Sequence, residues 1–237
     1  MKFTFSVDYD THKLGSEHYL TEFKPAPASE FLPDWFKDME HKDSFRTAKH
    51  CRGVYDMMTS GYMVVWPFDV TITKDENGKV FAKRTRDNER FMFHPHPQEQ
   101  MGPYPDVNLG MQKFGVDKVT LPYKIRSSKN TSVYMLQPPY RPELKVEVMP
   151  GVIDTDKFYS PLNVLFTIKN TEFSKDIKIA AGTPLAVLIP FVRSEWELEY
   201  NPLNVKQDQI IQENIGNIDR YYQKRLWTRK VFKRKEK

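Results

Sequence analysis

Short apolar runs separated by turn residues follow one another along most of the chain. Phe3, Phe5, Val7 and Tyr9 alternate with polar residues, which predicts a strand at the start of the sequence. Further strand-like runs lie at residues 62–66, 68–72, 80–81, 91–93, 119–125, 132–137, 144–148, 162–168, 177–179 and 185–191. Short strands at this spacing predict a mainly β fold, a sandwich or a barrel, rather than βαβ units.

Two dipeptides mark turns between these runs. Ser60-Gly61 precedes the apolar run at 62–66, and Asn77-Gly78 separates the run at 68–72 from the one at 80–81. Asn-Gly is a strong signal for a two-residue β-hairpin turn, because both residues tolerate a left-handed backbone. We therefore expect a hairpin centred on Asn77-Gly78.

Only the C-terminal region has a helical pattern. From Gln207 onward, apolar residues recur at spacings of three and four: Ile211, Ile215, Ile218, Tyr222 and Leu226. This pattern predicts one C-terminal helix that holds the end of the chain on the body. The expected organisation is a β-rich domain over residues 1–204, followed by an amphipathic helix and a basic tail over 205–237.

The N-terminal part includes a proline-rich arm at residues 25–37. Pro25, Pro27 and Pro33 restrict its backbone, and Trp35 and Phe36 supply apolar surface to pack it onto the body. The arm is interpreted as a structural clamp.

Composition and cysteine count limit the class of protein. Hydrophobic residues make up 39% of the chain and aromatic residues 14%, as in a globular protein. Cys51 is the only cysteine, so the chain forms no internal disulfide. There is no apolar run of the ~20 residues that a membrane helix needs, and the N-terminus lacks an apolar leader. We expect a protein that acts in the cytosol or in a particle assembled there, without a membrane span and not secreted.

Charge is concentrated at the C-terminus. The last eighteen residues, RYYQKRLWTRKVFKRKEK, carry a net charge of +8, against +5 for the whole chain, so the rest of the chain is slightly acidic. Basic residues interleaved with aromatic ones suit binding to nucleic acid or to an acidic protein. The predicted partner-binding residues are Arg225, Trp227, Arg229, Lys230 and Lys233. A tail packed on its own body remains the alternative.

The segment 151–159, GVIDTDKFY, carries the most information about family. Together with Gly182, Leu185, Ala186 and Leu188, it resembles the third and fourth motifs of the dUTPase and dCTP deaminase superfamily. Arg126-Ser127-Ser128 and Ser60-Gly61-Tyr62 stand where that family has a phosphate loop and its first motif. The resemblance implies a β-clip fold, often a homotrimer, with Asp154 as the residue that accepts a proton from the attacking water.

A second resemblance is to uncharacterised tailed-phage proteins. They share a proline-rich entry, an H-P-x-x-Q segment and a closing G-T-P-L…I-P-F-x-R, which here spans residues 182–193. This resemblance implies no activity. With it, the expected location becomes the cytoplasm of the host cell or an assembled virus particle.

The chain departs from the dUTPase pattern at positions that the chemistry needs. Met63 replaces the aspartate that helps to hold Mg²⁺, Thr183 and Val187 replace two fourth-motif residues, and Lys157 stands in place of the base-stacking tyrosine. The glycine-rich C-terminal arm of the family is absent. Because phosphate hydrolysis needs the metal and its donors, the sequence favours a non-enzymatic protein without a cofactor. A deoxynucleotide enzyme using Asp154 and Mg²⁺ is the alternative, with Arg126, Ser127, Ser128, Phe158 and Tyr159 as substrate or phosphate ligands.

A third hypothesis is a metal site in the segment HPHPQE. His94, His96 and Glu99 form a two-histidine, one-carboxylate set of the kind that binds iron in oxygenases. Prolines at 95 and 97 disturb the strand geometry that would align the two imidazoles. A stiff loop with locally bonded histidines is therefore the favoured interpretation, and the iron oxygenase is kept as an alternative.

Overall fold

The computed structural model describes residues 1–7, 23–40, 47–74, 76, 80–84, 93–96, 116–169, 175–217 and 221–234. The strands are β1 Phe3–Val7, β2 Ala26–Pro27, β3 Tyr62–Val65, β4 Val70–Lys74, β5 Val80–Arg84, β6 Phe93–Pro95, β7 Asp117–Ser127, β8 Thr131–Leu136, β9 Val146–Val148, β10 Gly151–Ile153, β11 Pro161–Ile168, β12 Ile177–Ile179 and β13 Pro184–Val192. The helical segments are η1 Ala28–Phe31, α2 Asp34–Lys37, η2 Ala48–His50, α3 Arg52–Thr59, α6 Val205–Asn217 and the π-helical turn η3 Tyr222–Leu226.

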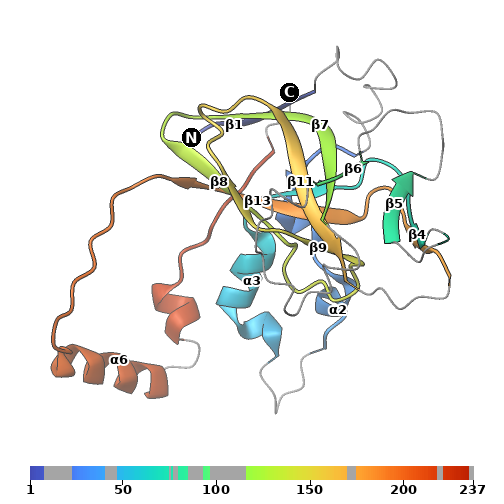
Figure 1. The fold of residues 1–237 in the computed structure, drawn as a ribbon. Helices are drawn as coiled ribbons and strands as arrows, with labels where there is room; N and C mark the ends of the chain where they lie inside the picture. Colours follow the sequence, from blue (N-terminus) through green and yellow to red (C-terminus); the bar gives the residue numbers. More distant parts are fainter. Residues whose placement is uncertain are drawn as a thin grey trace.

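Antiparallel sheets form the body of the molecule (Figure 1). One sheet has the order β1-β7-β11-β9, with β6 also pairing with β7, and a second has the order β10-β8-β13-β3-β2. A third sheet has the order β12-β4-β5, and β4 and β5 are antiparallel. The predicted turn at Asn77-Gly78 lies outside the described residues. The prediction of a mainly β fold is confirmed.

The core lies between these sheets. Apolar side chains from all three sheets form one cluster that includes Trp66, Leu121, Phe166, Ile179 and Leu185. On β7 and β11 the cluster residues alternate along the strand, so the period-two pattern of the sequence becomes one buried face of this sheet: Val119, Leu121, Tyr123 and Ile125, and Leu162, Val164, Phe166 and Ile168.

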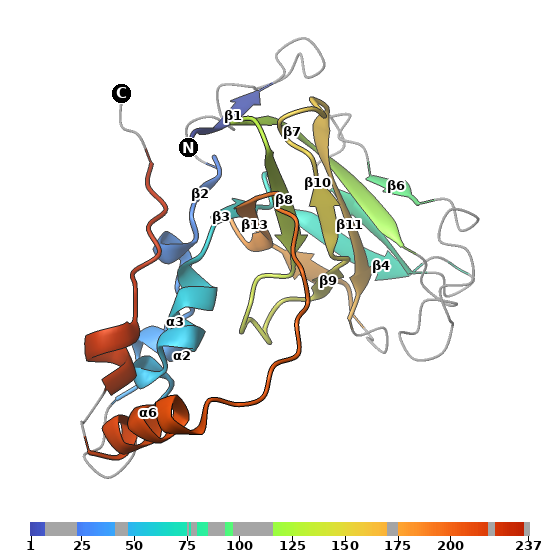
Figure 2. The same cartoon turned by 90° about the vertical axis from the view of Figure 1, so that its left-hand side faces the viewer.

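The outer face of the sheet β10-β8-β13-β3-β2 is also apolar. Met63, Val65 and Val187 form a second buried cluster with Ala28, and Phe31 packs against it. These covering residues belong to the proline-rich arm, which crosses the outer face next to β3 (Figure 2). Phe36 is buried, and the indole N–H of Trp35 donates to the carbonyl of Tyr140 over 3.0 Å. The arm therefore covers one part of the outer face.

The predicted C-terminal helix is present as α6, and the structure adds the shorter helix α3, which was not predicted. Helix α3 precedes β3, buries Met58 and ends where Thr59 donates from its side chain to the carbonyl of Tyr55. Its eight residues are too few for a helical period to stand out in the sequence. Helix α6 begins at Val205, but Ile211 and Ile215 are exposed, so α6 does not hold the tail on the body as predicted. Ile218 lies outside the described residues. Within the described residues, no helix has the length and apolar character to cross a membrane.

The basic tail is held on the body by contacts of its own side chains instead of by α6. The indole N–H of Trp227 donates to Asp56 over 2.8 Å, and the Lys230 ammonium pairs with the same carboxylate at 2.8 Å. Phe232 packs edge-to-face on Tyr62, and Arg234 pairs with Glu30 at 2.9 Å. The end of the chain thus lies along α3 and β3 (Figure 2).

Gly61 fixes the turn between α3 and β3. Its φ of +81° lies in the left-handed region, and a Cβ there would run into the carbonyl oxygen of Leu188 on β13.

Gly61→Ala should lower the free energy of unfolding by about 1–3 kcal/mol from backbone strain alone, with the clash in addition. Gly53→Ala in α3, where a Cβ would meet only the Cys51 sulfur at 4.0 Å, is the control and should leave stability unchanged or slightly higher. Urea denaturation of both variants tests this, and equal midpoints would contradict it.

Candidate functional site

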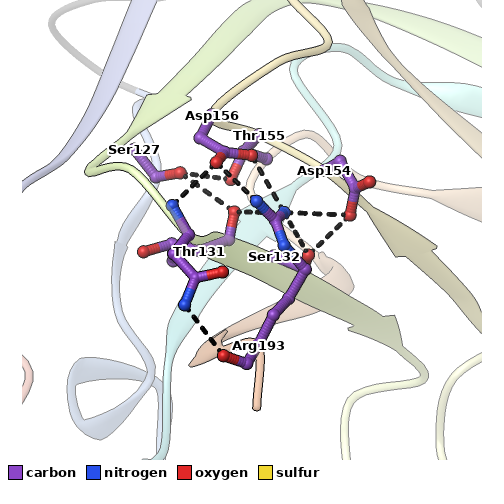
Figure 3. Close-up of polar contacts among 8 residues, drawn as sticks. Ser127, Thr131, Ser132, Asp154, Thr155, Asp156 and Arg193 are labelled. Atoms are coloured by element: carbon purple, nitrogen blue, oxygen red, sulfur yellow. Dashed lines mark hydrogen bonds and ion pairs between the residues drawn. The ribbon is translucent and has the colours of Figure 1, made fainter. Parts of the chain in front are cut away.

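Arg193 contacts two aspartates, Asp154 and Asp156 (Figure 3). Arg193 follows directly after β13, and Asp154 and Asp156 lie in the turn that follows β10. Its guanidinium donates to both oxygens of Asp156, over 2.9 and 2.5 Å, and lies 3.2 Å from the Asp154 carboxylate. This is the bidentate geometry that suits an arginine and a carboxylate best. We call these three residues the Arg193 clamp.

Two further residues form hydrogen bonds with the Arg193 clamp. One is at the start of β8 and the other is in the turn before it. Ser132 donates to Asp154 over 2.6 Å and accepts from Arg193 over 2.9 Å. The backbone N–H of Asn130 donates to Asp156 over 2.8 Å, and the Asn130 side-chain amide donates to the Arg193 carbonyl over 2.8 Å. Asn130 has a φ of 62°, a conformation that asparagine tolerates better than most residues. The clamp therefore joins β8, β13 and the turn after β10.

The clamp keeps both aspartates ionised. The hydrogen bonds from Arg193 are the main cause that lowers the pKa of Asp156 from 3.8 to about 2, and the Asn130 N–H adds to the effect. The hydroxyl of Ser132 is the main cause that lowers the pKa of Asp154, with Arg193 contributing less. Asp156 is only 6% exposed, whereas Asp154 is 49% exposed. A carboxylate with a lowered pKa is a weak base near neutral pH.

A small cavity lies beside the clamp, under the same hairpin. It has a volume of about 200 Å³ and is lined mainly by apolar residues, among them Ile125, Met135, Val152, Phe158 and Leu162. Thr155, Ser160 and Asn163 add polar atoms to its wall. Phe158, one of the predicted substrate ligands, therefore does line a cavity.

The predicted phosphate residues are used inside the protein. The Ser127 hydroxyl lies 2.7 Å from the Thr155 hydroxyl, and Ser128 accepts from the backbone N–H of Lys2 over 2.8 Å. The guanidinium of Arg126 stacks over the ring of Tyr159, 4.5 Å from its centroid. The structure brings Arg126, Ser127, Tyr159 and the Asp154 hairpin to one end of the molecule, but both serines already have polar partners.

Two of the three predicted metal residues, His94 and His96, lie in the described part of the chain. His94 lies in β6 opposite Lys118, and the backbone N–H of His96 donates to the carbonyl of Val116 over 2.7 Å. Glu99 lies outside the described residues. Among the described residues, no cluster of three histidine, cysteine or carboxylate side chains could hold a metal ion.

The predicted tail residues have different surroundings. Trp227 and Lys230 contact Asp56, and the Arg52 guanidinium lies 4.8 Å from the centroid of the Trp227 ring. Arg225, Arg229 and Lys233 are exposed. The tail therefore uses part of its charge to bind its own body and leaves part on the surface.

Sequence reasoning did not single out Arg193, Ser132, Asn130 or Asp56. One feature of the sequence could have predicted a cation at this place. Two aspartates only two residues apart repel each other when their turn packs against the body, so they need a cation nearby. The arginine that meets this need comes 37 residues after Asp156, and only the pairing of β13 with β8 brings it there.

No protein-family model and no curated protein matches the chain. Among solved structures, the chain is similar to the native EIAV dUTPase, with a TM-score of 0.34 and 12% sequence identity. The match covers 69% of this chain and 92% of that protein. A similarity this low transfers no residue role and no activity to this chain.

The lowered pKa of Asp156 gives a pH-dependent stability. Between about pH 4 and pH 2 the unfolded chain takes up a proton at Asp156 that the folded chain does not, so stability is full above this window and falls as the pH is lowered through it. Asp156→Asn should remove this contribution and flatten the dependence by about one proton. Asp154→Asn, which alters a more exposed carboxylate, should flatten it less. Urea denaturation at a series of pH values measures the slopes, and equal slopes for the wild type and Asp156→Asn would contradict the assignment.

Proposed function

We propose that this chain is a non-enzymatic homo-oligomeric β protein on a dUTPase-like fold, acting as a component of a phage-type virus particle or as a partner-binding module. The observation that carries the proposal is the Arg193 clamp. It uses Asp154, the residue that the resemblance makes a general base, to fasten three parts of the fold together.

The chemistry of the clamp argues against the enzymatic alternative. A general base needs a free lone pair aimed at water and a pKa near the working pH. One oxygen of Asp154 already accepts from Ser132 and faces Arg193, and its pKa is lowered. Met63, which stands where the family has a metal-holding aspartate, is buried in the second apolar cluster and offers no oxygen. Mg²⁺-assisted hydrolysis therefore lacks two of its parts.

An uncovered apolar surface supports the homo-oligomer. On the outer face of β10, β8 and β13, Val152 is 58% exposed and Tyr134 is 43% exposed. The ring of Tyr134 stacks on Phe191 with centroids 4.2 Å apart. The proline-rich arm covers the other part of this face, and contiguous exposed apolar surface commonly marks an interface. A second copy of the chain is the proposed cover, and a trimer is the assembly that the resemblance favours.

The segment that resembles phage proteins supports the structural role. Its last residue is Arg193, and Thr183 within it accepts a backbone hydrogen bond from Trp66 over 2.9 Å. The segment thus serves to hold sheets together, which suits a particle component whose task is shape rather than turnover.

A nucleotide assay tests the non-enzymatic part of the proposal. The protein is incubated with Mg²⁺ and each deoxynucleoside triphosphate, and released phosphate or pyrophosphate is measured. We expect no turnover above that of Asp154→Asn, the matched variant that lacks the candidate base. Turnover by the wild type that Asp154→Asn abolishes would replace this proposal with the deoxynucleotide enzyme.

The exposed cations of the tail favour a second candidate function, which is binding to a polyanion or an acidic protein. Arg225, Arg229 and Lys233 are exposed within nine residues of one another, while Lys230 and Arg234 pair with carboxylates of the body. Exposed cations at this density attract phosphates, and the attraction weakens with salt.

Matched variants distinguish the effect of the exposed tail charges on binding from the effect of the contacts that hold the tail on the body. Replacing Arg225, Arg229 and Lys233 with glutamine should weaken binding to single-stranded DNA several-fold and reduce the dependence on salt. Lys230→Gln, which breaks the pair with Asp56, should lower stability and change DNA binding less. Fluorescence anisotropy at several salt concentrations measures both. Equal binding by the wild type and the triple variant would show that the tail does not act in this way.

A further inference from the structure

The basic tail lies along the body with alternate side chains facing inward. After η3 the chain is irregular and extended, and it runs past α3 toward β3 (Figure 2). Every second residue contacts the body: Lys230 pairs with Asp56, Phe232 packs on Tyr62, and Arg234 pairs with Glu30. The residues between them are exposed: Arg229, Val231 and Lys233. The tail therefore has an inward row (230, 232, 234) and an outward row (229, 231, 233), each with two cations and one apolar residue.

Two carboxylates of the body bind the inward cations in the way that phosphates would. One oxygen of Asp56 accepts from both the Trp227 indole N–H and the Lys230 ammonium, each over 2.8 Å. Glu30 accepts from Arg234 over 2.9 Å. Carboxylates and phosphates both offer anionic oxygens to lysine and arginine. Each pair can therefore exchange its body carboxylate for a phosphate.

These ion pairs are of the kind that a polyanion can displace. Lys230 and Arg234 remain 47% and 40% exposed in their pairs, and Glu30 is 48% exposed. Ion pairs in contact with water contribute little to stability, and salt screens them. The tail is therefore held on the body by weak electrostatic contacts.

Packing beneath the tail is also incomplete. Of residues 227–234, only Trp227 and Phe232 are partly buried, and none is fully buried. A cavity of about 340 Å³ remains between Phe232 of the tail and aromatic residues of the body, among them Phe3 and Phe191. Well-packed parts of a protein leave few voids of this size. The contact between tail and body thus has little apolar packing to hold it closed.

Two aromatic rings are held against the body together with the inward cations. The Trp227 ring has the Arg52 guanidinium 4.8 Å from its centroid, and Phe232 packs edge-to-face on Tyr62 with centroids 6.0 Å apart. Aromatic side chains stack on nucleobases that a single strand leaves accessible, whereas a duplex keeps its bases stacked on one another. Rings and cations that alternate along an extended chain therefore fit the bases and phosphates of a single strand.

We propose that the inward row and Trp227 are the masked half of a binding surface for single-stranded nucleic acid, with Asp56 and Glu30 as the internal competitor. The exposed outward row makes the first contact with phosphates. The strand then displaces the two carboxylates, so that Lys230 and Arg234 bind phosphates and Trp227 stacks on a base. This proposal deepens the polyanion binding proposed above and rests on it.

Removing the competitor tests the mask. The unmasked variant carries Asp56→Asn and Glu30→Gln, which keep the size of both side chains. It should bind a short oligothymidylate several-fold more tightly than the wild type, and this advantage should shrink as salt screens the mask of the wild type. The control carries Glu197→Gln and Glu199→Gln, two exposed acids after β13, and raises the net charge by the same amount. Fluorescence anisotropy should show a smaller gain for the control.

A second pair of changes tests which cations are released. Adding Lys230→Gln and Arg234→Gln to the unmasked variant should abolish its gain. At about 0.7 for each lost phosphate contact, the slope of log affinity against log salt should become flatter by about 1.4. An unchanged affinity would overturn the proposal, because the released cations would then not contact the strand.

Trypsin digestion shows independently whether the tail leaves the body. The unmasked variant should be cut within residues 225–234 faster than the wild type, and the control at the wild-type rate. Circular dichroism and thermal melting check that the body stays folded. Glu30→Gln alone, at a half-exposed carboxylate, should give a smaller gain in binding and keeps the test valid if the double change unfolds the protein.

Inorganic polyphosphate distinguishes stacking from charge. The gain on unmasking should be larger for oligothymidylate than for polyphosphate, and Trp227→Leu in the unmasked variant should remove the difference. Equal gains for both ligands would overturn the assignment to nucleic acid.

The remaining outcomes separate the mask from the polyanion function itself. Faster cleavage without tighter binding would overturn the mask, and so would unchanged cleavage, since Asp56 and Glu30 would then not hold the tail. In both cases, weaker binding by the triple variant of Arg225, Arg229 and Lys233 would leave the polyanion function standing. If neither the wild type nor the unmasked variant binds oligothymidylate or polyphosphate at low salt, the polyanion function is refuted.

Discussion

The Arg193 clamp is the interaction on which the arrangement of this end of the molecule depends. Asp154 and Asp156 lie in the turn that follows β10. This strand has only three residues, so its pairing contributes little to stability by itself. The clamp compensates by joining the turn to β13 and to the start of β8 with charge-assisted hydrogen bonds, which are about twice as strong as neutral ones. Because the guanidinium serves two carboxylates, loss of Arg193 would leave two like charges close together, one of them almost wholly buried.

A second constraint is that one sheet is apolar on both faces. Its inner side contributes to the main core, while its outer side is shared between the proline-rich arm and an uncovered area around Tyr134 and Val152. A sheet of this kind in an antiparallel fold usually has one solvated face. The sequences of β3 and β13 are continuously apolar because both faces of their sheet are apolar. The uncovered part of the outer face is the reason why a second copy is proposed to bind there.

The sequence allowed most strands to be predicted, because each depends on local alternation and on turn residues such as Gly61. It also allowed Asp154 and Asp156 to be placed together on one hairpin. It did not allow their partner to be found, since Arg193 reaches them only through the pairing of β13 with β8. Helix α3 was missed because it is short, and the docking of the tail was missed because Asp56 lies about 170 residues before Trp227. Contacts between distant parts of the chain leave no local pattern to read.

The strand pairing has a consequence for how the chain folds. Strand β1 pairs with β7, more than a hundred residues later, and β3 pairs with β13, which ends at Val192. During synthesis, β1 therefore lacks its partner until β7 has been made, and β3 lacks its longer partner until β13 has been made. Loop closure over such distances is slow compared with local hairpin formation, and unpaired apolar strands are prone to misassociate during the delay. The main core therefore cannot close before β13 has been made, and until then β3 exposes an apolar edge to wrong partners.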